Sequence, residues 1–208
     1  MVDVKTFPTT EEELLELGPG PHRFPASFAD FENATAHSKL KMEYVNESIV
    51  IMSYATLVHE AMVLRLGALL SVLDARLFSL IGSNHKVYRK GMDNAFAPDI
   101  FVIKGRAKRV KPTGKTSMVT NPWLIIEILS PGTEPYDLGT KLPAYKRFPS
   151  VEYIFYVDQY EERATLHSRS SAKLWRSEDF GPEQPNITIG DARFSLTDIY
   201  QNLLGEEE

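Results

Sequence analysis

The chain has 208 residues, with 43% hydrophobic and 25% charged residues, which suits a globular protein with a sizeable core. It contains no cysteine, which excludes disulfides and thiolate metal sites. A formal net charge of −5 argues against a protein that coats nucleic acid without specificity. The sequence has neither an apolar stretch long enough to span a membrane nor the apolar core of a signal peptide, so we expect a cytoplasmic protein.

The first 38 residues are predicted to form an arm and a loop. Within them, "TEEELLEL" (10–17) predicts a short helix capped by Thr10, and residues 18–38 are rich in Pro, Gly, Ser and His. The next segment, "KLKMEYVNESIVIMS" (39–53), alternates on both sides of Asn46–Glu47 and predicts a β-hairpin. Because no linker, repeat or low-complexity block follows, we expect one domain over residues 39–208.

The remaining chain alternates between helical and strand patterns. Residues 56–77 are apolar around most of a helical circumference, which predicts a long buried helix. The later elements are predicted as strands at 85–90, 97–104, 122–129 and 151–158, a helix near 140–148, strands at 162–169 and 173–177, and a last helix at 195–204 before a frayed "GEEE". This order predicts an α/β sandwich around one mixed sheet.

A glutamate lies inside the predicted strand "PWLIIEIL" (122–129). Alternation places Glu127 between Ile125 and Leu129 on one face, and the opposite face is apolar as well, as in a central strand covered on both sides. An unpaired charge there costs several kcal/mol, so Glu127 must be protonated, paired or bound to a cation.

An aspartate creates the same problem in the preceding strand, "APDIFVIK" (97–104). Asp99 lies near the start of this strand, whereas Glu127 lies near the end of the next. If the two strands are antiparallel neighbours, both carboxylates lie at the same end of the sheet.

The predicted helix after this strand supplies a lysine. On a helical wheel Lys141 falls between Tyr145 and Phe148, so it points along the apolar face. Pro143 is tolerated only in a first turn, which sets the predicted helix start near Gly139–Thr140. Lys141 is then expected at a helix amino terminus, where the backbone also favours an anion.

Two carboxylates and a lysine at one sheet end suit metal-assisted hydrolysis of a phosphodiester. Asp99 and Glu127 would hold Mg²⁺ or Mn²⁺ through hard oxygens, with the backbone carbonyl of Ile128 as a further ligand. Lys141 would orient or activate the attacking water or stabilise the developing charge. A buried structural ion network of the same residues is the alternative interpretation.

The segments "APDI", "IIEILSP", "DLGTKLPAYKRF" and "VEYIFYVD" resemble the Uma-two family, bacterial proteins described as putative endonucleases and long catalogued as a domain of unknown function. That family belongs to the PD-(D/E)XK, restriction-endonuclease-like superfamily. The resemblance, from about Glu43 to Asp158, implies a sandwich with a central mixed β-sheet flanked by helices, preceded by a β-hairpin extension. It also implies that Asp99 and Glu127 are the metal-binding carboxylates.

The chain departs from the superfamily pattern in the position of its lysine. That pattern places a lysine two residues after the glutamate, where this chain has Leu129. Some members supply the lysine from the following helix, and Lys141 is similar to such a migrated residue.

Four further residues are candidate accessory groups. The resemblance implies a recurring glutamate at Glu43 and a recurring histidine at His59, and either residue could be a helper ligand. The alternative for Glu43 is a water-exposed carboxylate at a strand edge. The alternative for His59 is a hydrogen-bonded histidine near a helix start. Asp137 is interpreted as a partner of Lys141 or of the helix start, or as a metal ligand. Tyr145 is interpreted as a core residue, or as one whose hydroxyl lies near the site.

The predicted function is a metal-dependent endonuclease that hydrolyses DNA, with a homodimer as the assembly that would cut both strands. The basic stretch "KGRAKRVKPTGK" (104–115) is either a solvated hairpin or an arm that contacts phosphate through Lys108, Arg109 and Lys111. Two alternatives stay open: a catalytically inactive nuclease fold that binds nucleic acid or a partner, and a metal-dependent phosphoesterase for a small substrate.

Overall fold

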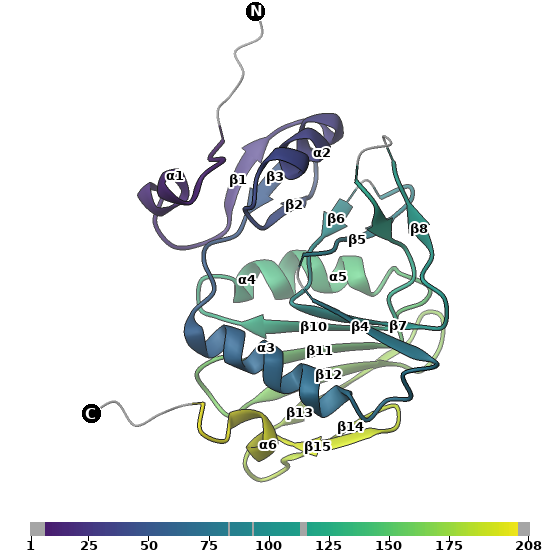
Figure 1. Cartoon of the computed structure of the whole chain (residues 1–208). Coiled ribbons are helices and arrows are strands. Elements are labelled where there is room, and N and C mark those ends of the chain that lie inside the picture. Colours follow the sequence, from purple (N-terminus) through teal and green to yellow (C-terminus); the bar gives the residue numbers. More distant parts are fainter. Residues whose placement is uncertain (1–6, 83, 93, 113–115, 204–208) are drawn as a thin grey trace, which may run out of the picture. The chain divides into compact units, whose positions relative to one another are not determined.

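The computed structural model describes residues 7–82, 84–92, 94–112 and 116–203. The chain divides into two compact units (Figure 1). The first unit is made of Met1–Tyr54, Ser83–Ala97 and Lys108–Thr120, and the second of Ala55–Gly82, Pro98–Ala107 and Asn121–Glu208. The predicted frayed end and residues 113–115 of the basic stretch lie outside the described residues.

The first unit is built on a seven-stranded sheet in the order β1-β3-β2-β6-β5-β9-β8. Its elements are α1 (Glu11–Glu16), β1 (His22–Pro25), α2 (Phe28–His37), β2 (Met42–Tyr44), β3 (Ser48–Ile51), β5 (Val87–Arg89), β6 (Asn94–Phe96), β8 (Arg109–Val110) and β9 (Met118–Val119). An apolar cluster that includes Phe31, Met42 and Ile49 packs α2 against this sheet.

The amino-terminal region is more ordered than its sequence indicates. The Thr10 cap and the hairpin are confirmed: Thr10 forms a capping box with Glu13, and the β2–β3 turn places Asn46 and Glu47 at φ 49° and 56°, as a two-residue hairpin turn requires. The loop predicted over residues 18–38 is wrong, because it contains β1 and α2. Ser27 starts α2 with a capping box to Asp30, a signal hidden among the surrounding loop-forming residues.

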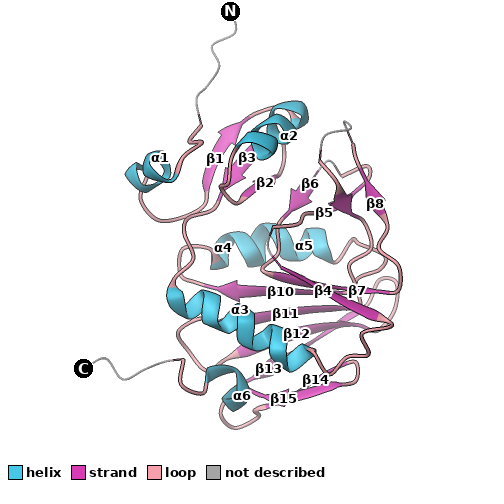
Figure 2. Ribbon diagram, viewed as in Figure 1, coloured by secondary structure: helices cyan, strands magenta, loops and turns pink. Residues whose placement is uncertain are grey.

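The second unit contains a mixed six-stranded sheet in the order β13-β12-β11-β10-β7-β4, together with the β14–β15 hairpin. Its elements are α3 (Leu57–Leu70), β4 (Phe78–Gly82), β7 (Ile100–Lys104), β10 (Leu124–Leu129), α4 (Glu134–Tyr136), a π-helical turn (Asp137–Lys141), α5 (Leu142–Tyr145), β11 (Tyr153–Asp158), β12 (Ala164–Arg169), β13 (Trp175–Phe180), β14 (Asn186–Ile189), β15 (Ala192–Ser195) and α6 (Leu196–Tyr200). Figure 2 shows α3 and the α4–α5 segment beside this sheet. No helix within the described ranges combines the length and apolar character needed to cross a membrane.

Strand β10 is central and buried along its whole length, as its sequence predicts. It pairs antiparallel with β7 and parallel with β11. Leu124, Ile126 and Ile128 belong to an apolar cluster with Met62 and Leu66 of α3. Glu127 lies on the other face of the sheet, toward the segment that carries Lys141.

The segment after β10 corrects two predictions. The helical backbone begins at Glu134, not near Gly139–Thr140, and it includes the π-helical turn Asp137–Lys141 before α5. Pro143 has no N–H to donate to the turn before it, and an α-helical turn would bring its ring against the carbonyl of Gly139. The wider turn accommodates the proline, so Lys141 lies inside a helical segment and not at its amino terminus.

Candidate active site

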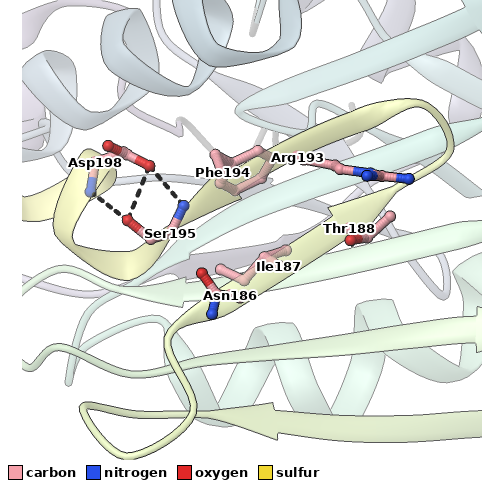
Figure 3. Close-up of a pocket in the computed structure, with 7 residues that line it drawn as sticks. All are labelled: Asn186, Ile187, Thr188, Arg193, Phe194, Ser195 and Asp198. Carbon is pink, nitrogen blue, oxygen red and sulfur yellow. Dashed lines mark hydrogen bonds between the residues drawn. The ribbon is translucent and has the colours of Figure 1, made fainter.

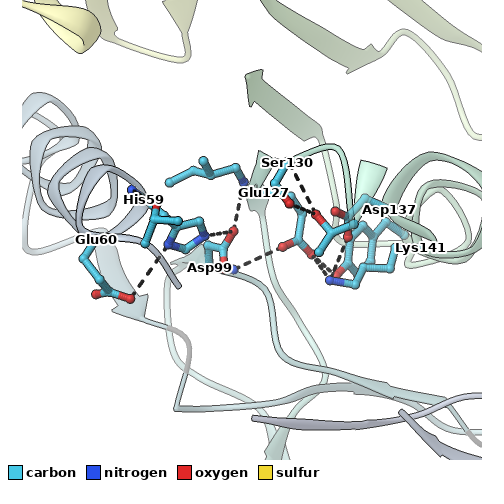
Figure 4. A network of polar contacts seen from close by, with 11 residues as sticks. His59, Glu60, Asp99, Glu127, Ser130, Asp137 and Lys141 are labelled. Carbon is cyan, nitrogen blue, oxygen red and sulfur yellow. Dashed lines mark hydrogen bonds and ion pairs between the residues drawn. The ribbon is translucent and has the colours of Figure 1, made fainter. Parts of the chain in front are cut away.

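Asp99 and Glu127 meet at the same end of the β7–β10 pair, as the sequence predicts. The antiparallel register pairs Ile126 with Ile100, which brings Asp99 level with Glu127. The backbone N–H of Asp99 donates to Glu127 Oε2 at 3.3 Å, and the N–H of Ile128 donates to Asp99 Oδ2 at 2.9 Å (Figure 4). The Asp99 and Glu127 side chains are buried, with exposed fractions of 4% and 2%.

Lys141 lies between two carboxylates. Its Nζ is 3.1 Å from Glu127 Oε1 and 2.9 Å from Asp137 Oδ1. All three side chains are almost fully buried, and burying such charges is tolerated only where they are paired. The prediction that Lys141 points inward is therefore confirmed, and so is its pairing with Asp137.

Two tyrosine hydroxyls donate hydrogen bonds to this cluster. Tyr145 is fully buried, and its hydroxyl donates to Glu127 Oε1 at 2.5 Å, so it is both a core residue and a neighbour of the site. Tyr156 donates to the backbone carbonyl of Asp137 at 3.1 Å. Burial raises the pKa of the Tyr156 hydroxyl, and the nearby Glu127 and Asp137 carboxylates raise it further, so it remains a neutral donor.

Sequence reasoning missed Tyr156. It lies directly opposite Glu127 in the parallel β10–β11 pair. The strand "VEYIFYVD" is predicted, but its register against β10 depends on the chain crossing over between them. Alternation predicts which side chains of one strand share a face, but only the parallel register of β10 and β11 shows that Tyr156 lies opposite Glu127.

His59 joins the network through Asp99. Thr56 caps α3 by accepting the backbone N–H of His59 at 3.1 Å, which fixes the histidine in the first helical turn. Its Nε2 lies 3.2 Å from Asp99 Oδ2, and its Nδ1 lies 3.8 Å from Glu60 Oε1. The predicted helix start is confirmed, and the imidazole touches a candidate metal-binding carboxylate.

The other predicted residues lie in the first unit. Glu43 is fully buried on β2, and its Oε1 accepts the backbone N–H of Ala97 at 2.9 Å. The interpretation of Glu43 as a water-exposed carboxylate is therefore wrong, because β2 lies between β3 and β6 and is not an edge strand. Lys108, Arg109 and Lys111 are exposed on and beside β8, which forms a hairpin with β9.

The donor atoms of the cluster suit a hard divalent cation. Asp99 and Glu127 offer carboxylate oxygens, the ligand type that Mg²⁺ prefers, and Mg²⁺ retains several waters of its own. Within the residues that the structure describes, no group of three or more His, Cys, Asp or Glu side chains has the arrangement of a complete metal site. A cation here would therefore need water, substrate oxygens or a backbone carbonyl such as that of Ile128 to complete its coordination.

A shallow pocket lies elsewhere in the second unit, on the β14–β15 hairpin and the start of α6 (Figure 3). Asn186, Thr188 and Arg193 contribute to its lining, as do Ser195 and Asp198. The last two residues form the capping box of α6, so their polar atoms already serve the fold. No residue of the carboxylate–lysine cluster lines this pocket.

A mixed sheet with two buried carboxylates, one of them paired with a buried lysine from the helical segment after β10, defines a restriction-endonuclease-like α/β protein. The model of the Uma2 (Uma-two) family, described as "Putative restriction endonuclease", matches residues 27–196, and the chain belongs to this family. A crystal structure described as a putative nuclease of DUF820 from Anabaena variabilis has the same fold, with a TM-score of 0.65 and 18% identity over 95% of this chain and 100% of that one.

Two curated relatives come from Synechocystis sp. (strain ATCC 27184 / PCC 6803 / Kazusa). The uncharacterized protein sll1609 is 26% identical over 137 residues, which are 65% of this chain and 76% of that protein. The uncharacterized protein slr1290 is 26% identical over 158 residues, which are 76% and 80% of the two chains.

Proposed function

We propose that the protein is a metal-dependent endonuclease that hydrolyses phosphodiester bonds in DNA. The observation that carries the proposal is the 3.1 Å contact between Lys141 Nζ and Glu127 Oε1. The Asp99 carboxylate lies next to this pair, because it accepts the N–H of Ile128 in the same strand, β10. This arrangement supports the proposal because a PD-(D/E)XK site needs two carboxylates and a lysine, and here the segment after β10 would supply the lysine. The family description and the nuclease of the same fold support the class of reaction.

In this reaction water adds across one P–O bond. The water oxygen bonds to phosphorus, the bond to the leaving sugar oxygen breaks, and one water proton ends on that leaving oxygen. Mg²⁺ or Mn²⁺, held by Asp99, Glu127 and the Ile128 carbonyl, would lower the pKa of a bound water and offset negative charge on the phosphate. Lys141 would orient the attacking water and stabilise the charge that develops on the phosphate oxygens.

The neighbouring residues would keep these groups in position. Tyr145 orients Glu127 through its hydroxyl, and His59 contacts Asp99 from the first turn of α3. Asp137 pairs with Lys141. Glu43, which is fully buried on β2, stays an accessory candidate from the family resemblance alone.

The proposed substrate is DNA, contacted through phosphate by Lys108, Arg109 and Lys111. These three side chains are exposed, and lysine and arginine are the usual phosphate contacts in DNA-binding proteins. A homodimer is the proposed assembly, because one site cuts one strand and a duplex has two. Sedimentation equilibrium tests the dimer, and a monomer at micromolar concentration contradicts it.

The first experiment is a titration of Mn²⁺ and of Mg²⁺ into the wild type and into Asp99→Asn, followed by calorimetry and by the shift in melting temperature that binding produces. We expect saturable binding to the wild type and none to Asp99→Asn, whose folding is checked by circular dichroism. Asp191→Asn, an exposed aspartate in the β14–β15 turn, is the matched control and should bind metal normally. Cleavage of supercoiled plasmid by the wild type and by Lys141→Met then tests turnover.

The second candidate function is a nuclease fold that binds nucleic acid or a partner without turnover. It is favoured by the engagement of both Glu127 oxygens, Oε1 by Lys141 and Tyr145 and Oε2 by the N–H of Asp99. This function would be supported if the protein neither bound metal nor cleaved DNA, and if Asp99→Asn still bound DNA.

A further inference from the structure

The buried cluster contains three carboxylates, Asp99, Glu127 and Asp137, together with the Lys141 ammonium. Glu127 and Asp137 contact Lys141 Nζ, whereas Asp99 accepts the N–H of Ile128 and contacts His59. Their exposed fractions are 4%, 2% and 2% for the acids and 1% for Lys141. A divalent cation would add positive charge beside Asp99 and Glu127, and the Lys141 ammonium already lies against the Glu127 carboxylate.

Lys141 and a cation at the site proposed above would compete for the same carboxylate. Glu127 Oε1 accepts from Lys141 Nζ at 3.1 Å, so the lysine occupies one coordination direction of that oxygen. For Glu127 to serve a cation fully, the ammonium must move toward another acceptor.

Asp137 is the acceptor placed to receive it. Its Oδ1 is closer to Lys141 Nζ than Glu127 is, at 2.9 Å, and both residues belong to the same π-helical turn. The Tyr156 hydroxyl donates to the backbone carbonyl of Asp137 at 3.1 Å and ties this turn to β11. Asp137 and Lys141 therefore belong to one anchored turn, whereas Glu127 belongs to β10, so the ammonium can leave Glu127 and keep its contact with Asp137.

We propose that Asp137 is a positioning residue that takes over the Lys141 ammonium when Glu127 binds the cation. Without the Asp137 carboxylate, the lysine would remain on Glu127 and oppose metal binding. This inference rests on the proposed metal site, and it assigns to Asp137 an effect on metal affinity through Lys141, without contact between Asp137 and the metal.

A double-mutant cycle on Mn²⁺ affinity tests the inference. Free Mn²⁺ is measured by electron paramagnetic resonance in the wild type, Asp137→Asn, Lys141→Met and the double variant. We expect Asp137→Asn to weaken Mn²⁺ binding about tenfold, and Lys141→Met to tighten it. In the Lys141→Met background Asp137→Asn should weaken binding only about two- to threefold. Without the lysine, the substitution removes only the long-range Coulomb attraction between the Asp137 charge and the cation.

The cycle separates positioning from a structural ion pair. The asparagine keeps an amide oxygen for Lys141, so the folded structure should persist, and circular dichroism checks it. An unchanged Mn²⁺ affinity in Asp137→Asn, or the same loss in both backgrounds, overturns the inference. If Asp137→Asn does not fold, Lys141→Met remains decisive, because unchanged or weaker Mn²⁺ binding in that variant contradicts the competition.

Failure of the inference is distinguishable from failure of the proposed function. If the wild type binds no Mn²⁺, or if Asp99→Asn binds it normally, the proposed metal site is wrong and the inference fails with it. If Asp99→Asn abolishes binding but the cycle shows no coupling, the metal site stands and only the role of Asp137 is wrong. Asp191→Asn serves again as the control for loss of one exposed carboxylate.

Discussion

Asp99 and Glu127 are linked across two neighbouring strands by hydrogen bonds between the carboxylate of each and the backbone of the other strand. The backbone N–H of Asp99 donates to the Glu127 carboxylate at 3.3 Å, and the Asp99 carboxylate accepts the N–H of Ile128, the residue after Glu127, at 2.9 Å. Each acidic side chain is thus positioned by the backbone of the other strand. Both carboxylates are fixed by the sheet itself, which is more rigid than a loop.

This relationship predicts that asparagine and alanine have different effects at position 99. Asp99→Asn keeps an amide oxygen for the Ile128 N–H, whereas Asp99→Ala leaves that buried donor without its acceptor. We expect Asp99→Ala to be less stable than Asp99→Asn by about 1–3 kcal/mol. Urea unfolding of the metal-free proteins measures the difference, and equal free energies of unfolding would show that the Ile128 bond contributes nothing.

A second prediction concerns the hydroxyl of Tyr145. Tyr145→Phe removes the donor that lies 2.5 Å from Glu127 Oε1 while it keeps the buried ring. Hydrogen bonds to charged groups contribute about 1.5–3 kcal/mol, so a loss of that size in the free energy of unfolding is expected. Tyr160→Phe is the control, because that side chain is 53% exposed and its loss should change little. Equal stability of the two variants contradicts the role of the Tyr145 hydroxyl.

The central part of the fold and site could be predicted because the signals were local. Six consecutive buried residues in β10 read as a strand covered on both faces, and a carboxylate in such a strand demands a partner. An antiparallel neighbour that also contains a carboxylate then located the second group. The inward direction of Lys141 followed from helical spacing alone.

The rest depended on contacts that spacing does not encode. Strands β8 and β9 have two residues each, which is too short for a periodic pattern, and the seven-stranded sheet was therefore not predicted. The π-helical turn Asp137–Lys141 accommodates Pro143 inside the helical segment, so the rule that places a proline in the first turn misplaced the helix start. Tyr156 reaches the site only through the parallel register of β10 and β11.

A third prediction tests the proposed DNA contacts on the β8–β9 hairpin. Replacing Lys108, Arg109 and Lys111 by glutamine should weaken DNA binding and flatten its dependence on salt, by about 0.9 in the logarithmic slope for each phosphate that the protein no longer neutralises. Fluorescence anisotropy at several salt concentrations measures the slope. The control replaces Lys173 and Arg176 by glutamine at another exposed surface. An unchanged slope in the triple variant would leave the hairpin as a solvated loop.

A fourth prediction concerns the pH dependence of stability through His167 on β12. The residue is 7% exposed, with its Nδ1 2.7 Å from Ser177 Oγ and its ring edge-on to Tyr156. Burial lowers the pKa of His167 to about 4, with the Lys146 charge acting in the same direction and Asp179 opposing it. In the unfolded chain the imidazole keeps its ordinary pKa near 6.5.

Between these two pKa values the unfolded state binds a proton that the folded state excludes. The contribution of His167 to stability is therefore complete above about pH 6.5 and is lost as the pH falls toward 4. His167→Gln should remove this part of the pH dependence, at most about 3 kcal/mol over that range. Urea unfolding at pH 7, 6, 5 and 4 measures it for the wild type, His167→Gln and the exposed control His37→Gln. Parallel curves for the wild type and His167→Gln would show that the histidine is not excluded from protonation in the folded protein.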